Sequence, residues 1–247
     1  MEIERKFLVK RLPAHLSERE HCAISQAYVC ADPVIRVRRS EQGGEERFIL
    51  TVKGKGLGAH EEFELPLSRE SYEELAAKRA EWRAAWIEGL GGFPERTPLN
   101  AQVGPVVKYE GFTWQNVLFE SQPGVYVVGH LFLPDAAKFK PPYPCVMMQV
   151  GHSDNGILNP RYAAHAAATA AAGFAAFAWD PVGQGERRQI DRRFDRQFSE
   201  CAREHSSLGA RGWLVGWNFA RFRIWDAIRA VDYVLTRKEI DGKRLGV

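Results

Sequence analysis

The feature that most constrains how this chain folds is a change of pattern near residue 78. Before it, short β-rich runs alternate with turn-forming stretches, which predicts an antiparallel sheet. After it, strands alternate with helices, which is typical of an α/β sheet with crossover helices. We therefore predict two domains, residues 1–78 and residues 79–247.

The first pattern predicts strands over 2–9, 22–29, 34–40, 47–55 and 61–67. Ser68 has the character of a helix N-cap, so a short helix is expected over 71–78, followed by a Trp-rich amphipathic stretch over 81–87. The second pattern predicts strands over 111–121, 125–133, 145–150 and 175–179 and from 244 onward, with helices over 161–172 and 218–236.

Composition limits the classes of partner. Of the 247 residues, 45% are hydrophobic and 26% are charged, which is ordinary for a soluble globular protein. The formal net charge of +3 is too small to indicate a nucleic-acid partner. The four cysteines contain no C-x-x-C pair, and the acidic N-terminus does not resemble a signal peptide. The longest apolar run, 163–179, is alanine-rich and too short for a membrane span, so we expect a cytoplasmic protein without a membrane partner.

Charged residues recur at a spacing of two along the predicted N-terminal strands, and alternate residues of a strand share one face. The residues in question are Glu2, Glu4 and Lys6, Arg36 and Arg38, Lys53 and Lys55, and Glu62 and Glu64. One such strand is usually a solvated face. Four of them can converge inside a barrel, where cations would hold a polyanion and carboxylates a hard divalent cation.

These motifs resemble those of the CYTH, or triphosphate tunnel, metalloenzymes over roughly residues 1–78. The matching runs are Glu2-x-Glu4-x-Lys6, Ile35-Arg36-Val37-Arg38, Thr51-Val52-Lys53-Gly54-Lys55 and Glu62-Phe63-Glu64. The resemblance implies triphosphate binding by Lys6, Arg36, Arg38, Lys53 and Lys55, and Mg²⁺ or Mn²⁺ binding by Glu2, Glu4, Glu62 and Glu64. It also implies hydrolysis of triphosphates as the family's activity.

Two departures from that family pattern affect the expected fold. His60 stands where the family usually has arginine, two residues before the Glu-x-Glu pair. The sequence after residue 78 does not resemble the second half of the tunnel. We therefore expect an antiparallel β half-barrel with unpaired edge strands, and self-association through exposed sheet edges.

In the second domain, two turns each follow an apolar strand: 151–156, with the sequence GHSDNG, and 180–185, with the sequence DPVGQG. Ligands of open α/β sheets bind at that end of the strands, although ordinary strand-to-helix loops have the same appearance. Both runs resemble α/β-hydrolases of the acetyl xylan esterase type, as do 225–233 and 241–247. That resemblance covers roughly residues 80–247 and implies a partial α/β-hydrolase sheet of carboxylic ester hydrolase ancestry.

In that fold a G-x-S-x-G elbow carries the nucleophile, followed in the chain by an acid and a histidine. We expect the nucleophile to be absent here, and therefore name no catalytic residue. Ser153 lacks the second glycine of the elbow, and His205 has the character of a surface or packing histidine. Gly151 and His152 form a candidate oxyanion loop, and no cofactor is expected for this segment.

Three functional hypotheses follow. The first is an incomplete ester hydrolase, inactive as an esterase, joined to a partial triphosphate-binding segment. The second is metal-dependent binding or hydrolysis of triphosphate or polyphosphate by the N-terminal segment. The third is a misjoined or truncated chain without a function of its own.

Overall fold

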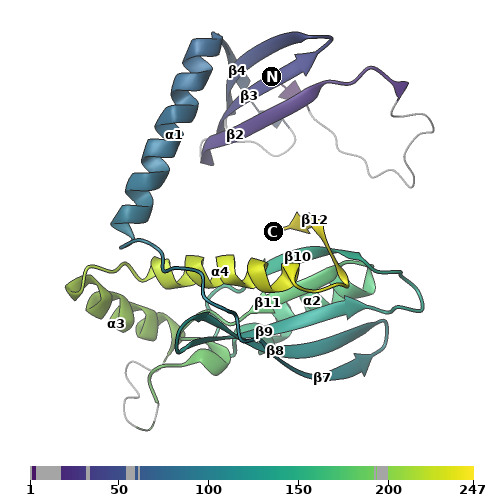
Figure 1. The fold of residues 1–247 in the computed structure, drawn as a ribbon, viewed down its shortest axis with the longest axis vertical. Coiled ribbons are helices and arrows are strands. Elements are labelled where there is room, and N and C mark those ends of the chain that lie inside the picture. Colours follow the sequence, from purple (N-terminus) through teal and green to yellow (C-terminus); the bar gives the residue numbers. More distant parts are fainter. Residues whose placement is uncertain are drawn as a thin grey trace. The chain divides into compact units, whose positions relative to one another are not determined.

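The computed structural model describes residues 2–3, 18–31, 34–53, 59–60, 62–191, 193 and 200–247 (Figure 1). The chain divides into two compact units, Met1–Trp86 and Ile87–Val247. The first unit contains a four-stranded and a two-stranded sheet, and the second unit contains a six-stranded sheet.

The first unit contains an antiparallel four-stranded sheet in the order β2-β3-β4-β6. Its strands are β2 (Ala23–Ala31), β3 (Val34–Gln42), β4 (Glu45–Lys53) and β6 (Glu62–Leu67). A separate pair joins β1 (Glu2–Ile3) to β5 (Ala59–His60). The predicted antiparallel pairing is confirmed, and the described strands form an open sheet without barrel closure.

Helix α1 (Arg69–Gly89) contacts β4 of this sheet through its first turn. The Phe48 and Tyr72 rings lie 4.9 Å apart, and the Arg69 guanidinium lies over Phe48 while also pairing with Glu46. Ser68 caps the helix as predicted, because its Oγ accepts a hydrogen bond from the Ser71 N–H. The helix continues across residue 78, so the two helical stretches expected over 71–78 and 81–87 are one helix.

The second unit is a six-stranded mixed sheet in the order β12-β10-β11-β9-β8-β7. The strands are β7 (Gln102–Tyr109), β8 (Phe112–Gln122), β9 (Val125–Pro134), β10 (Tyr143–Gln149), β11 (Ala175–Trp179) and β12 (Ile240–Gly246). Strands β12, β10 and β11 are parallel, whereas β7, β8 and β9 form an antiparallel meander that joins β11. β7 was not among the predicted strands.

Helices cover both faces of this sheet. Alternate residues of the buried strand β11 point to opposite sides, and each side packs against a different helix. Phe177 packs with Tyr233 of α4 (Ala220–Leu235), while Ala176 and Ala178 pack with Ala166 of α2 (Pro160–Ala171). Figure 1 shows α4 crossing the sheet. A third helix, α3 (Cys201–Leu214), lies between the predicted strand 175–179 and the predicted helix 218–236, where no helix was predicted.

Two short 3-10 turns, η2 (Gly156–Leu158) and η3 (Gly185–Arg187), follow the parallel strands β10 and β11. The parallel pairing puts the carboxyl ends of these two strands at one edge of the sheet. None of the described helices is long and apolar enough to cross a membrane.

Candidate functional site

The strand register of the first unit places the predicted ligands of β3, β4 and β6 on one face. Arg36 lies opposite Thr51, which lies opposite Glu64, and Lys53 lies opposite Glu62. Directly paired residues of antiparallel strands project from the same side of a sheet. Val37 and Phe48, which alternate with these residues, are buried on the other face, where Phe48 packs against α1.

Glu62 is at the centre of this charged face. Its carboxylate pairs with Arg36 Nη2 at 3.3 Å and with Lys53 Nζ at 2.9 Å. The side chains of Arg36, Lys53 and Glu62 are only 13%, 14% and 11% exposed. A bound polyanion would therefore compete with Glu62 for both cations, unless a metal ion occupied the carboxylate.

The other predicted ligands are placed unequally. Glu64 accepts a hydrogen bond from Thr51 Oγ1 at 3.4 Å, and Arg38 donates to Gln26 rather than joining the Glu62 pairs. Glu2 is described only as part of β1, in register with His60. Glu4, Lys6 and Lys55 lie outside the described residues.

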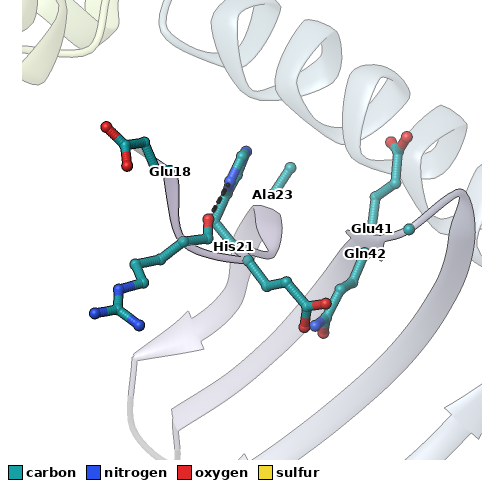
Figure 2. A pocket seen from close by; sticks show the side chains of 8 residues that line it. Glu18, His21, Ala23, Glu41 and Gln42 are labelled. Carbon is teal, nitrogen blue, oxygen red and sulfur yellow. Dashed lines mark hydrogen bonds between the residues drawn. The ribbon is translucent and has the colours of Figure 1, made fainter. Parts of the chain in front are cut away.

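One hollow of this unit lies elsewhere on the sheet. It has a volume of about 740 Å³ and is shown in Figure 2, where the His21 ring contacts the Arg19 carbonyl. Glu41 and Gln42 line it at the β3–β4 turn, at the end of β3 away from the pair Val34 and Lys53. Three glutamates on its rim are unsuited to an anion: Glu18, Glu20 and Glu41.

In the second unit, hydrogen bonds join two loops. One follows β10 (residues 150–155, the β10 loop) and the other follows β11 (residues 180–188, the β11 loop). The Ser153 N–H donates to Gln184 Oε1 at 2.7 Å, and the Gly185 N–H donates to the Asp154 carbonyl at 3.2 Å. Arg188 reaches back to the Asp154 carboxylate at 2.6 Å. These contacts make the two loops one structural element.

Asp180 is the buried centre of this element. Its two carboxylate oxygens accept the backbone N–H groups of Ile157 (2.8 Å) and Glu186 (3.1 Å). Gly156 and Gly185 enclose the carboxylate, and a Cβ at either position would lie 1.9 or 2.0 Å from an Asp180 oxygen. Burial raises the pKa of Asp180, and the two backbone N–H donors oppose that rise. Within the DPVGQG run, Asp180 therefore has a structural role, because it accepts hydrogen bonds from the turns η2 and η3 that follow β10 and β11.

A buried ion pair connects the β11 loop to α4. Arg187 Nη1 lies 2.7 Å from Asp226 Oδ2, and their side chains are 3% and 2% exposed. The same nitrogen donates to the Asp180 carbonyl at 2.9 Å. Separating the two side chains would leave a buried charge without its partner, which is strongly destabilising, so the ion pair holds the β11 loop against α4.

The candidate oxyanion residues lie in the β10 loop. Gly151 packs against Tyr162, whose hydroxyl would be 2.6 Å from a Cβ at this position. His152 Nε2 is 3.1 Å from His205 Nδ1, and His205 Nε2 donates to the Val182 carbonyl at 2.7 Å. Burial lowers the pKa of His205, which keeps its ring neutral and available as an acceptor. His205 is thus a packing histidine that connects α3 to both loops.

Within the described residues, no serine hydroxyl or cysteine thiol is hydrogen-bonded to a histidine. Ser153 is buried, and its Oγ accepts from Asn159 Nδ2 at 3.3 Å. Burial raises the pKa of the Cys145 thiol to about 12, so it does not supply a thiolate. Neither residue has the neighbouring base that activates a serine or cysteine nucleophile.

Sequence reasoning did not identify His130 as a residue of interest. It lies on β9, is 1% exposed, and has Nδ1 within 3.0 Å of Asn116 Oδ1 and 3.3 Å of Trp114 Nε1. Its Nε2 has no hydrogen-bond partner, and burial lowers its pKa to about 4. The available sequence signal was a histidine within an apolar strand, which by itself is typical of a packed core residue.

Comparison with known proteins finds structures of esterase-like α/β fold. No protein-family model matches the chain, and no curated protein matches it. A candidate acetyl xylan esterase from Bacteroides fragilis NCTC 9343 is similar in structure, with a TM-score of 0.59 and 19% identity over 70% of this chain and 46% of that one. A methylesterase has a TM-score of 0.48 at 23% identity, covering 68% of this chain and 33% of its own. An acetyl xylan esterase from Paenibacillus sp. R4 has a TM-score of 0.41 and 23% sequence identity, covering 60% of this chain and 45% of that one.

The similarity to the Bacteroides fragilis structure shows a shared esterase-like fold, and this chain spans less than half of that structure. None of the three similar structures named above is a triphosphate tunnel metalloenzyme. The resemblance of residues 1–78 to that family thus rests on its motifs alone.

Proposed function

We propose that the second unit is part of a carboxylic ester hydrolase domain and that the chain in this form does not hydrolyse esters. The observation that carries the proposal is the joined pair of loops at the carboxyl ends of β10 and β11. In an α/β sheet this is the edge where ligands bind. Gly151 and His152 would offer their backbone N–H groups to the acyl oxygen.

The expected inactivity has a separate reason. Acyl transfer needs a nucleophile with a base in hydrogen-bond reach, and the described residues contain no such pair. An oxyanion-binding loop without a nucleophile binds an ester oxygen but forms no acyl-enzyme.

The test is turnover of p-nitrophenyl acetate by the full chain and by Ser153→Ala. We expect neither protein to release p-nitrophenol faster than the ester hydrolyses in buffer alone. Saturable turnover that Ser153→Ala abolishes would show that Ser153 is a nucleophile and would overturn the proposal. Ser206→Ala is the matched control, because the Ser206 hydroxyl is exposed and only contacts the Ala202 carbonyl.

A second function is favoured by the charged face of the first unit. Arg36, Lys53 and Glu62 converge there from three strands, although they are far apart in the sequence. We propose that this face binds a triphosphate together with Mg²⁺ or Mn²⁺, the metal releasing Glu62 from its two cations.

Calorimetric titration of the full chain with tripolyphosphate, with and without Mn²⁺, tests this second proposal. We expect binding to require the metal and to weaken at least about tenfold in Lys53→Gln, since a charge-assisted contact contributes about 1.5–3 kcal/mol. Lys108→Gln, in the second unit, is the control. Binding that is equal in both variants would contradict the proposal.

A further inference from the structure

Three side chains meet at the base of the β11 loop. His130 comes from β9, Asp180 from the end of β11, and Glu186 from η3. Each offers one ligand atom, and these atoms lie within 4.8 Å of one another. His130 and Asp180 are buried, whereas Glu186 is exposed.

The imidazole supplies the observation that points to a ligand. His130 is 1% exposed, yet its Nε2 has no hydrogen-bond partner, so this buried polar atom is uncompensated. Its Nδ1 lies 3.0 Å from Asn116 Oδ1 and accepts from Trp114 Nε1 at 3.3 Å. Metal binding at Nε2 requires the other tautomer, in which Nδ1 carries the proton, donates it to Asn116 and gives up the bond from Trp114. Metal-binding histidines are commonly oriented in this way, with the other ring N–H donated to an oxygen.

The carboxylates complete the donor set. Each oxygen of Asp180 accepts one backbone N–H and keeps a second lone pair. Zinc bonds to nitrogen and carboxylate oxygen are about 2.0–2.2 Å long, which puts tetrahedral ligands about 3.4 Å apart. The exposed Glu186 side chain can make the small inward shift that this requires.

We propose that His130, Asp180 and Glu186 bind a divalent transition metal ion of the Zn²⁺ class. One imidazole and two carboxylates suit such an ion, and three protein ligands leave a fourth position for water or another small oxygen ligand. This goes beyond the ester-hydrolase proposal, because it requires no nucleophile, and it differs from our expectation that this segment needs no cofactor. It is also separate from the charged face of the first unit.

The experiment uses the full chain, stripped with chelator and dialysed. Zn²⁺ affinity is measured by competition with a chromogenic chelator, and bound zinc is counted by mass spectrometry after gel filtration. We expect about one zinc per chain, and Zn²⁺ should raise the melting temperature. Glu186→Gln should weaken binding at least about tenfold, as should His130→Gln, because a lost ligand costs no less than a lost supporting contact.

Controls separate this site from other histidines and glutamates. His152→Gln removes one member of the His152–His205 pair, and Glu110→Gln removes an exposed carboxylate at the β7–β8 turn; both should bind zinc like the unmodified chain. If His130→Gln does not fold, the exposed Glu186 variant decides the question. The proposal is overturned if no stoichiometric zinc is retained, or if Glu186→Gln binds as tightly as Glu110→Gln. The first result would indicate a buried water molecule at Nε2 instead.

Discussion

The substitution Gly185→Ala tests whether Asp180 is held as tightly as its surroundings indicate. Gly185 has φ +54°, and a Cβ there would be 2.0 Å from Asp180 Oδ2 and 2.5 Å from its Cγ. The carboxylate would have to leave its position and lose the N–H donors of Ile157 and Glu186. The β11 loop should then lose the hydrogen bond from Ile157 that joins it to the segment after β10.

The magnitude follows from two contributions. Alanine in the left-handed region costs about 1–2 kcal/mol. Each lost hydrogen bond to a charged group costs about 1.5–3 kcal/mol, so the two bonds of Asp180 add roughly 3–6 kcal/mol. We expect Gly185→Ala to lower the free energy of unfolding by at least about 4 kcal/mol, which is a large part of the total for most domains.

The matched control is Gly124→Ala in the β8–β9 turn. Gly124 also has a positive φ, +76°, but a Cβ there meets nothing within 4 Å. It should cost only the backbone contribution of about 1–2 kcal/mol. Both glycines lie in the second unit, so urea unfolding followed by tryptophan fluorescence compares them directly.

A double-mutant cycle with Asp180→Ala isolates the contact itself. Once the carboxylate is removed, Gly185→Ala should cost about as much as Gly124→Ala, giving a coupling energy of several kcal/mol. The reasoning is refuted if Gly185→Ala and Gly124→Ala destabilise the chain to within about 1 kcal/mol of each other.

Three further outcomes are expected. The pKa of His130 is about 4 in the folded chain and about 6.5 in the unfolded chain, so the unfolded state binds more protons between these pH values. The free energy of unfolding, measured by urea unfolding in the presence of chelator, should therefore fall by up to about 3 kcal/mol as the pH drops from 6.5 to 4. His130→Gln should flatten this pH profile. Asp226→Asn leaves the Arg187 guanidinium buried without its carboxylate and should cost about 3–5 kcal/mol, whereas Asp241→Asn, at a more exposed pair, should cost less than about 1 kcal/mol by the same measurement. If the chain self-associates through the edge strand β7, light scattering after gel filtration should show a lower mass for Val106→Lys, whose site is 54% exposed; an unchanged mass would exclude this edge.

Local periodicity was enough to locate most of the regular structure. The strands over 34–40, 125–133 and 175–179 were predicted within a few residues, because apolar and β-branched residues dominate them. β7 was missed because it is mostly exposed and contains Pro105, which weakens a strand signal. α3 was missed because its sequence is polar and includes two glycines, so it reads as a loop.

The sites were less accessible to sequence reasoning for a physical reason. Alternation within each strand predicted that Arg36 and Arg38 share a face, as do Glu62 and Glu64, whereas the register that places Arg36 opposite Thr51 and Thr51 opposite Glu64 was not predicted. The burial of Asp180 and the pairing of Arg187 with Asp226 depend on tertiary packing between segments far apart in the chain. No local pattern indicates which charged residue will be enclosed, so a charge within a loop is expected to be solvated.

The enclosure of Asp180 by two glycines affects how the chain's most recognisable motif should be interpreted. Residues 156, 180 and 185 constrain one another sterically, so a change at any one requires compensation at the others. This constraint comes from folding and persists whether or not an ester is ever cleaved. A chain that kept this fold would therefore keep these three residues even without hydrolysing an ester.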